Sequence, residues 1–139
     1  MISANLAVPL SFWDAYNTEE KSIRYRACLL LWIVTQYRYV PQPFQLQATI
    51  ALMSGSDTLI DVGTGYGKTL CMILPSLLYP NELQVVFSPL KRLQIVQVTE
   101  FLSYGLNALA VNEDTPHDPE LYKVRFQNIN ITLSPFQVT

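Results

Sequence analysis

The sequence predicts an α/β domain with a parallel sheet, and three observations lead to this prediction. A glycine-rich segment at residues 61–69 lies between apolar runs at residues 58–60 and 70–74. This is the strand–loop–helix order in which backbone N–H groups form a cradle for phosphate. Farther along the chain, apolar runs that suit buried strands alternate with stretches of helical length. Half of the 139 residues are apolar and only 14% are charged, which favours a folded chain over a disordered one.

The composition indicates the cellular environment of the protein and restricts how it could bind nucleic acid or a membrane. The formal charge of −2 provides no overall basic field, so any contact with nucleic acid must come from a local patch. Cys28 and Cys71 lie far apart without metal or redox spacing, which predicts a reducing, intracellular setting. No basic segment opens the chain as in a signal peptide. The longest apolar run, residues 27–34, is much shorter than the roughly 20 residues that span a bilayer, so it predicts a buried helix and no membrane contact.

Two helices and a strand are expected before the glycine-rich segment. Residues 21–38 have the pattern of a helix that packs onto the domain. The prolines Pro41 and Pro43 end it, because proline disfavours helix at its own position and at the preceding one. Residues 44–53 then form an amphipathic helix. A turn follows, and residues 58–62 form the first strand of the sheet.

After the glycine-rich segment a helix is expected to start near Gly67, with a kink or a break at Pro75. Residues 84–87 are apolar without interruption, which suits a central parallel strand covered on both faces. The next helix opens at Ser88–Pro89, since proline is favoured at the first helical position. It runs to about Tyr104, and Gly105 supplies the left-handed residue that ends it.

The last part of the chain continues the alternation. Residues 106–111 suit a third strand, Asp118 suits the N-cap of a further helix, and residues 129–133 suit the last strand. Strands that alternate with helices predict a parallel sheet with right-handed crossovers.

The glycine-rich segment carries the chemistry of a phosphate-binding loop. Glycines supply positive φ and close backbone approach to a ligand. Lys68 would neutralise the β- and γ-phosphates of a nucleotide, and the Thr69 hydroxyl would bind Mg²⁺. These two residues are the candidates for a catalytic role. The candidate nucleotide-binding residues of the segment are Gly63, Thr64, Gly65, Tyr66, Gly67, Lys68 and Thr69. Asp61 would repel phosphate unless its side chain is turned away or capped by a donor.

Four stretches resemble motifs of superfamily-two DEAD/DEAH-box helicases, in the order and spacing of the RecQ-like branch. They are residues 41–45, residues 63–71, residues 87–93 with 97–98, and residues 133–137. The resemblance covers about residues 39–138. It departs from the family pattern at Asp61, Gly63 and Val96.

The resemblance implies a P-loop NTPase (RecA-like) fold: an incomplete three-layer parallel sheet with helices on both faces, in residues 39–139. Residues 1–38 would then be a helical extension. It further implies the amino-terminal part of an ATP-dependent, 3′–5′ DNA helicase of the nucleus or nucleoid. ATP and Mg²⁺ would be the cofactors and single-stranded or forked DNA the partner, with RNA and the oligomeric state left open. By the same resemblance Gln45 would read the adenine edge, although a glutamine at a helix start is by itself usually just solvated.

Nucleic acid would contact the segments that resemble the family's nucleic-acid motifs. The residues concerned are Ser88, Pro89, Lys91, Arg92 and Ser134. Lys91 and Arg92 would lie in the first turn of a helix beside the carboxyl end of a strand, where ligands bind in such sheets. The same two charges suit an ordinary solvated helix face equally well.

Two alternatives stay open on sequence grounds. The sequence contains no hydrophobic strand that ends in an acidic pair, so it lacks a second Mg²⁺-binding acid and an acid to orient water. We therefore expect a helicase fragment that stops before the acidic box, or a non-catalytic, degenerate nucleotide-binding module. A P-loop kinase or transferase is disfavoured because it needs an arginine-rich lid, and residues 106–139 contain only Arg125.

Overall fold

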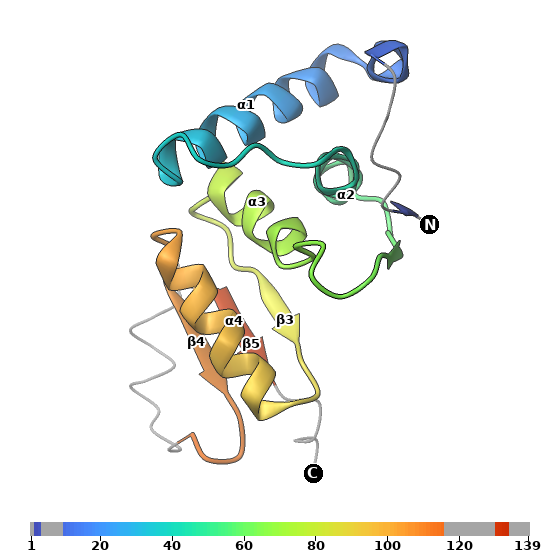
Figure 1. The fold of residues 1–139 in the computed structure, drawn as a ribbon. Coiled ribbons are helices and arrows are strands. Elements are labelled where there is room, and N and C mark those ends of the chain that lie inside the picture. The colour runs from blue at the N-terminus through green and yellow to red at the C-terminus, as the bar shows by residue number, and fades with distance from the viewer. Residues whose placement is uncertain (1, 4–9, 116–129, 134–139) are drawn as a thin grey trace. The chain divides into compact units, whose positions relative to one another are not determined.

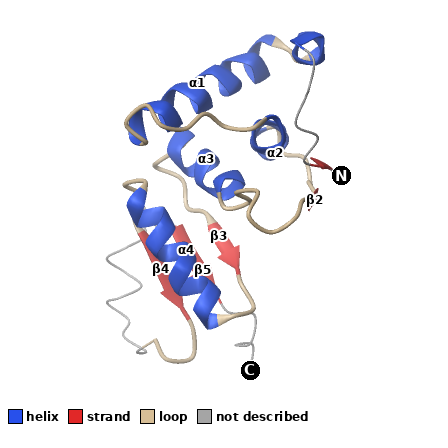
Figure 2. Cartoon of the chain, viewed as in Figure 1, coloured by secondary structure: helices blue, strands red, loops and turns tan. Residues whose placement is uncertain are grey.

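The structure is a computed structural model that describes residues 2–3, 10–115 and 130–133. The chain divides into two compact units, Met1–Leu78 and Tyr79–Thr139. Each unit contains its own parallel strands and its own helices (Figures 1 and 2). No helix in the described ranges has both the length and the apolar character needed to cross a membrane.

The first unit is mainly helical. Its elements in chain order are β1 (Ile2–Ser3), a 3₁₀ helix (Leu10–Ala15), α1 (Thr18–Val34), α2 (Pro43–Met53), β2 (Ile60–Asp61) and α3 (Leu70–Leu78). β1 and β2 pair in parallel. α3 contacts both α1 and α2 (Figure 1). The strand predicted at residues 58–62 is therefore present, but only its last part is paired.

α1 begins and ends earlier than the predicted range of residues 21–38. Its start is fixed by a capping box: the Asn17 side chain accepts from the N–H of Glu20 at 2.9 Å, and the Glu20 carboxylate accepts from the N–H of Asn17 at 2.8 Å. Its end is fixed by Gln36 and Tyr37, whose φ angles of 53° and 67° are left-handed and cannot continue the helix. The Asn-x-x-Glu spacing was the sequence signal for this start.

α3 runs through Pro75 to Leu78, so of the kink or break predicted at this proline, the break is wrong. Proline removes one helical hydrogen bond, but Pro75 is buried in a helix that packs against two others. Packing of this kind supplies most of a helix's stability in a protein, and it outweighs the missing bond. The helix begins at Leu70 rather than near Gly67. The intervening turn is held by bonds from the N–H groups of Leu70 and Cys71 to the carbonyls of Gly67 and Lys68, at 3.1 and 3.0 Å.

A small apolar cluster supports the loop between β2 and α3. Phe44 and Ala48 of α2 pack with Cys71 of α3, and Ile60 and Val62 pack against this group from the strand side. Helix, strand and loop are thus joined by one set of contacts. This cluster fixes where the glycine-rich segment starts and where it ends.

Cys71 yields a prediction about pH. Burial raises the pKa of its thiol from 9.0 to about 11. The folded state therefore keeps the proton that the unfolded state loses, and stability falls as pH rises from 9.0 to 11. The loss from this group should total about 2–3 kcal/mol. Urea unfolding across this pH range should show a smaller decline for Cys71→Ala than for the unchanged protein. An identical decline in the two proteins would refute the assignment.

In the second unit, the described residues form a three-stranded parallel sheet and one helix that packs on it. Its elements are β3 (Val85–Phe87), α4 (Lys91–Ser103), β4 (Ala108–Val111) and β5 (Asn130–Leu133). The strand order is β3-β5-β4. Val86 lies opposite Thr132, and Leu109 lies opposite Ile131. α4 contacts β4 and β5 (Figure 1). Strands are present near residues 106–111 and 129–133 as predicted, and both belong to this parallel set. The strand at residues 58–62, predicted as the first strand of the same sheet, instead pairs with β1 in the other unit.

Two details of the second unit differ from prediction. Among the described strands β3 is an edge strand rather than a central one, because β5 lies between β3 and β4. Phe87 is accordingly 69% exposed. α4 begins at Lys91, so Pro89 precedes the helix instead of opening it. The predicted end is confirmed: Gly105 has a φ of 77° and its N–H donates to the carbonyl of Leu102 at 3.0 Å.

Two predictions fall outside the described residues, namely the helix that starts at Asp118 and the position of Ser134. The predicted boundary between residues 38 and 39 stays a prediction. Within the first unit α1 contacts α2 and α3.

Candidate nucleotide-binding loop and nucleic-acid interface

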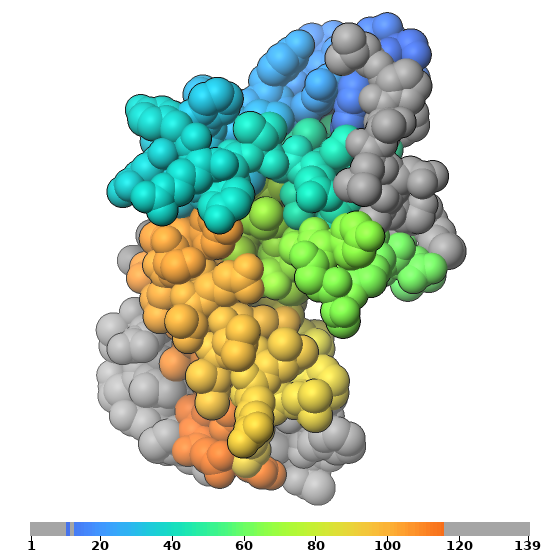
Figure 3. Space-filling view, viewed as in Figure 1, coloured from blue at the N-terminus to red at the C-terminus, as the bar shows by residue number. Residues whose placement is uncertain are grey.

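The loop between β2 and α3 has the backbone of a phosphate cradle. Gly65 and Gly67 have φ angles of 84° and 79°, a region that side chains other than glycine rarely adopt. Residues 63–66 are exposed, and the segment that contains the loop reaches the surface in the space-filling view (Figure 3). Among the described residues, no backbone carbonyl accepts from the N–H groups of residues 64–69. Several N–H donors are therefore available to an anion at this point.

Lys68 lies across the start of the loop. Its side chain is exposed, and Nζ donates to the carbonyls of Val62 at 3.0 Å and Gly63 at 3.4 Å. Thr69 is half-buried at the entrance to α3, and its carbonyl accepts from the N–H of Met72 at 3.0 Å. The cation, the hydroxyl and the N–H donors thus come from one continuous segment. The exposed carboxylate of Asp61 lies at the end of β2, in contact with water.

Tyr66 and Gly63 are neighbours within the loop. Tyr66 is 42% exposed. A Cβ atom at Gly63 would lie 3.3 Å from Cε2 of the Tyr66 ring. Glycine at position 63 thus leaves room for this ring, whereas the glycines at positions 65 and 67 are required by their φ angles.

Gln45 links α2 to the loop. It is only 2% exposed, and its amide is used at both ends. Nε2 donates to the carbonyl of Gly67 at 3.0 Å and to that of Tyr66 at 3.4 Å. Oε1 accepts from the N–H of Gln42 at 2.8 Å. The structure therefore brings the predicted adenine reader next to the predicted phosphate cradle. The bonds to the loop carbonyls are a feature that the sequence did not reveal.

These residues fit a magnesium–nucleotide. Exposed N–H groups, a flexible ammonium and a hydroxyl at a helix entrance are the donors and the ligand that triphosphate and Mg²⁺ require. The bonds of Lys68 to the carbonyls of Val62 and Gly63 are exposed, so they can be exchanged for bonds to phosphate at low cost.

The residues predicted to contact nucleic acid differ in accessibility. Pro89 and Arg92 are exposed, and Lys91 is the first residue of α4. Ser88 is only 1% exposed, and its hydroxyl oxygen has no hydrogen-bond partner among the described residues. The side chain of Ser88 therefore faces the interior of the unit, and this position can reach a ligand only through its backbone.

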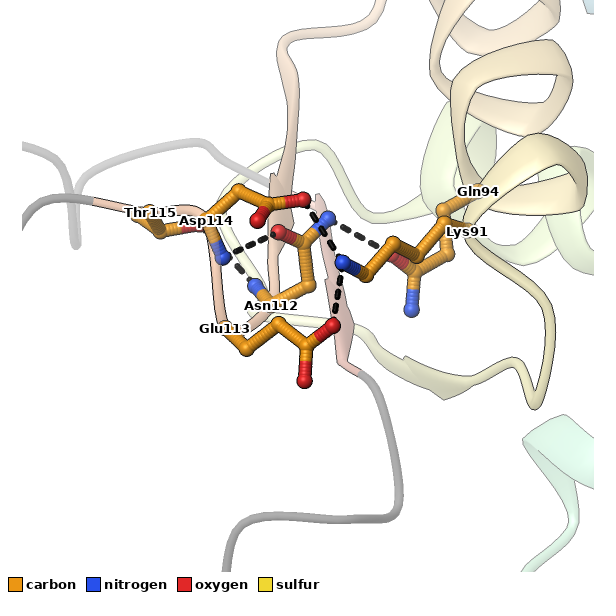
Figure 4. A network of polar contacts seen from close by, with 6 residues as sticks. All are labelled: Lys91, Gln94, Asn112, Glu113, Asp114 and Thr115. Carbon is orange, nitrogen blue, oxygen red and sulfur yellow. Dashed lines mark hydrogen bonds and ion pairs between the residues drawn. The ribbon is translucent and has the colours of Figure 1, made fainter.

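Lys91 is surrounded by carboxylates that lie far from it in sequence. Its Nζ pairs with Asp114 at 2.7 Å and also with Glu113 (Figure 4). The hydrogen bonds to Asp114 and then to Glu113 raise the pKa of Lys91. Sequence analysis assigned no role to either acid, because their approach to α4 depends on how β4 packs against it.

A buried glutamine completes this arrangement. Gln94 is 0% exposed. Its Nε2 donates to the carbonyl of Ser88 at 3.1 Å. Its Oε1 accepts from Nδ2 of Asn112 at 3.0 Å (Figure 4). Gln94 thus joins the segment before α4 to the end of β4. The sequence carried no local signal for Gln94, because the apolar Leu93 and Val96 of α4 are exposed while Gln94 is buried.

Comparisons with known proteins identify a family for this chain. Residues 42–134 match the DEAD/DEAH box helicase family. The chain is 35% identical over 94 residues to ATP-dependent helicase wrn-1 of Caenorhabditis elegans, which covers 63% of this chain and 8% of the relative. It is 35% identical over 81 residues to RecQ-like DNA helicase blm-1 of the same organism, covering 56% of this chain and 8% of the relative. It is 42% identical over 65 residues to ATP-dependent DNA helicase Q4 of Mus musculus, covering 45% and 5%.

The chain belongs to the DEAD/DEAH box helicase family, whose domain has the RecA-like P-loop fold. Its resemblance to RecQ-like helicases is confirmed by the relatives that it matches. The matched segments amount to between 5% and 12% of the length of these and similar relatives.

Proposed function

We propose that this chain is the nucleotide-binding and nucleic-acid-binding part of an ATP-dependent, RecQ-like DNA helicase that acts in the 3′–5′ direction. The observation that carries the proposal is the loop between β2 and α3. Its left-handed Gly65 and Gly67, its available N–H groups and the ammonium of Lys68 come together in a chain of this family. The proposal extends to residues 39–139 as part of a three-layer RecA-like domain, with residues 1–38 as an extension.

Each part of the loop has a distinct task in this proposal. The N–H groups of residues 63–69 hold the phosphates, and Lys68 gives up its carbonyl partners to neutralise them. Thr69 supplies its hydroxyl to Mg²⁺. When bound, Mg²⁺ would screen the charge that develops on the phosphates during transfer.

The amide of Gln45 already holds the loop through hydrogen bonds, and in this proposal it also binds adenine. Reading adenine would require at least one of its bonds to the loop carbonyls or to the N–H of Gln42 to be exchanged for a bond to the base. Binding of adenine by Gln45 would thereby change the hydrogen bonding of the Gly67 carbonyl in the loop. We expect Gln45→Ala to weaken binding of ATP more than binding of inorganic triphosphate.

The partner proposed from the named relatives is single-stranded or forked DNA, and the proposed setting is the nucleus or nucleoid. Lys91 and Arg92 are the candidate contacts to the phosphodiester backbone. They stand at the start of α4, where the N-terminal end of the helix dipole also favours an anion.

An ATPase assay with and without single-stranded DNA tests the proposal against a degenerate nucleotide-binding module. These 139 residues should bind ATP and DNA without appreciable turnover, because the sequence has no acidic pair after a hydrophobic strand. DNA should change the affinity for ATP if both ligands use one helicase domain. Binding of ATP with no effect of DNA and no affinity for DNA would favour the degenerate module.

A further inference from the structure

The turn that follows β4 is rigidly built. The N–H of Asn112 donates to Oγ1 of Thr115 at 2.9 Å, and the N–H of Thr115 donates to the carbonyl of Asn112 at 2.9 Å. The N–H of Asp114 donates to Oδ1 of Asn112 at 3.0 Å (Figure 4). We call residues 112–115 the acidic turn. These bonds fix the backbone that carries Glu113 and Asp114.

The acidic turn is also fixed relative to the helix that carries Lys91. Nδ2 of Asn112 donates to the buried Oε1 of Gln94 at 3.0 Å. Gln94 lies three residues after Lys91, so the two share a face of α4. The position from which the carboxylates reach Lys91 is therefore set by a part-buried hydrogen bond to a buried glutamine, rather than by the chance meeting of two mobile side chains.

The charges in this region cancel. Lys91 and Arg92 are the cations at the start of α4, and Glu113 and Asp114 are the facing anions. A phosphodiester would bind Nζ of Lys91 through an anionic oxygen, and the carboxylates of Glu113 and Asp114 already bind Nζ in the same way. The two cannot occupy the ammonium without mutual repulsion.

We propose that Glu113 and Asp114 are internal competitors of nucleic-acid phosphates for Lys91, so that the acidic turn sets how strongly this site binds a DNA strand. The inference rests on the proposed function, which makes Lys91 a nucleic-acid contact. A DNA strand must displace the carboxylates before its phosphate can bind Lys91. Only a ligand with several adjacent phosphates makes enough additional contacts to compensate for this displacement.

The strength of the competing contacts makes this exchange feasible. The side chains of Lys91, Glu113 and Asp114 are 42%, 65% and 74% exposed. Ion pairs with this exposure are weak and are screened by salt. A DNA strand can therefore displace the carboxylates of the acidic turn from Lys91. Because these ion pairs are weak, removal of the two charges should not unfold the unit.

The test measures binding of a fluorescein-labelled oligodeoxythymidine by anisotropy at several salt concentrations. The variant Glu113→Gln/Asp114→Asn keeps the size of both side chains and removes both charges. It should bind about two- to fivefold more tightly than the unchanged chain, the factor that corresponds to an exposed ion pair. Its salt dependence should steepen by about one phosphate contact, because Lys91 then engages the strand.

Two controls separate local competition from a general effect of charge. Glu82→Gln/Glu100→Gln makes the same change in net charge in the same unit, at acids with no ion pair to Lys91 among the described residues. It should tighten binding less than the acidic-turn variant. In a Lys91→Gln background the acidic-turn changes should lose most of their effect, because their target is gone.

The outcomes distinguish this inference from the function beneath it. If the unchanged chain binds the strand and the acidic-turn variant binds it equally or more weakly, the inference is overturned but the proposed function is not. An effect no larger than that of the control pair would do the same. If neither the unchanged chain nor any variant binds the strand, the proposed nucleic-acid function fails and the inference fails with it.

Discussion

Replacing Lys68 with alanine is expected to weaken binding of magnesium–ATP by about ten- to a hundredfold. A hydrogen bond from a charged donor is worth about 1.5–3 kcal/mol, and each 1.4 kcal/mol corresponds to a factor of ten in affinity. Among the residues that the structure describes, the ammonium is bound only to the carbonyls of Val62 and Gly63, at an exposed position. The substitution should therefore affect the ligand far more than the fold. Isothermal titration calorimetry gives the affinity, and thermal unfolding gives the stability.

Lys21→Ala is the matched control for this experiment. Lys21 belongs to the same compact unit, and its ammonium makes an exposed bond to the carbonyl of Asp14 at 3.4 Å. The control removes the same charge without touching the loop, so its affinity for ATP should stay close to that of the unchanged chain. Equal affinities for Lys68→Ala and Lys21→Ala would contradict the role assigned to Lys68.

Gly67→Ala should be the most damaging single change in the loop. The new Cβ would lie 2.9 Å from Nε2 of Gln45, at a φ of 79°. The left-handed conformation costs a non-glycine residue about 1–2 kcal/mol. The displaced amide cannot move freely, because it is buried and bonded at both ends. We expect a loss of stability of about 2–4 kcal/mol from strain and broken hydrogen bonds together, along with much weaker ATP binding.

Gly55→Ala isolates the contribution of backbone strain. Gly55 lies in the same unit with a φ of 72°, and its added Cβ would meet no atom within 4 Å. It should cost only the strain and leave ATP affinity unchanged. In a Gln45→Ala background the extra cost of Gly67→Ala should shrink, because the clashing group is absent. Equal costs at positions 55 and 67 would mean that Gln45 does not hold the loop.

Local patterns predicted the parts of the fold that depend on local chemistry. The positive φ of Gly105 and the end of α4 follow from one glycine after a helical run. The loop at residues 63–69 follows from glycine spacing between two apolar segments. The start of α1 was missed although Asn17 and Glu20 form a capping box. The sequence therefore does contain a local signal for the start of this helix.

Other features depend on packing between distant segments and have no local signature. Of the kink or break predicted at Pro75, the break is wrong because contacts with α1 and α2 outweigh one missing hydrogen bond. Lys91 forms an ion pair with Asp114, which lies 23 positions away in the sequence. The burial of Ser88 likewise depends on Gln94, which holds its carbonyl from within α4. A reading of motifs in sequence treats Ser88 and Lys91 as equally accessible, whereas only the side chain of Lys91 reaches the surface.

Binding of ATP by the loop between β2 and α3 can be measured by calorimetric titration of the unchanged chain with magnesium–ATP. We expect saturable binding of one nucleotide per chain. Inorganic triphosphate should compete with this binding, and Lys68→Ala should weaken it. Heats that match simple dilution at every nucleotide concentration, from a chain shown to be folded by circular dichroism, would contradict it.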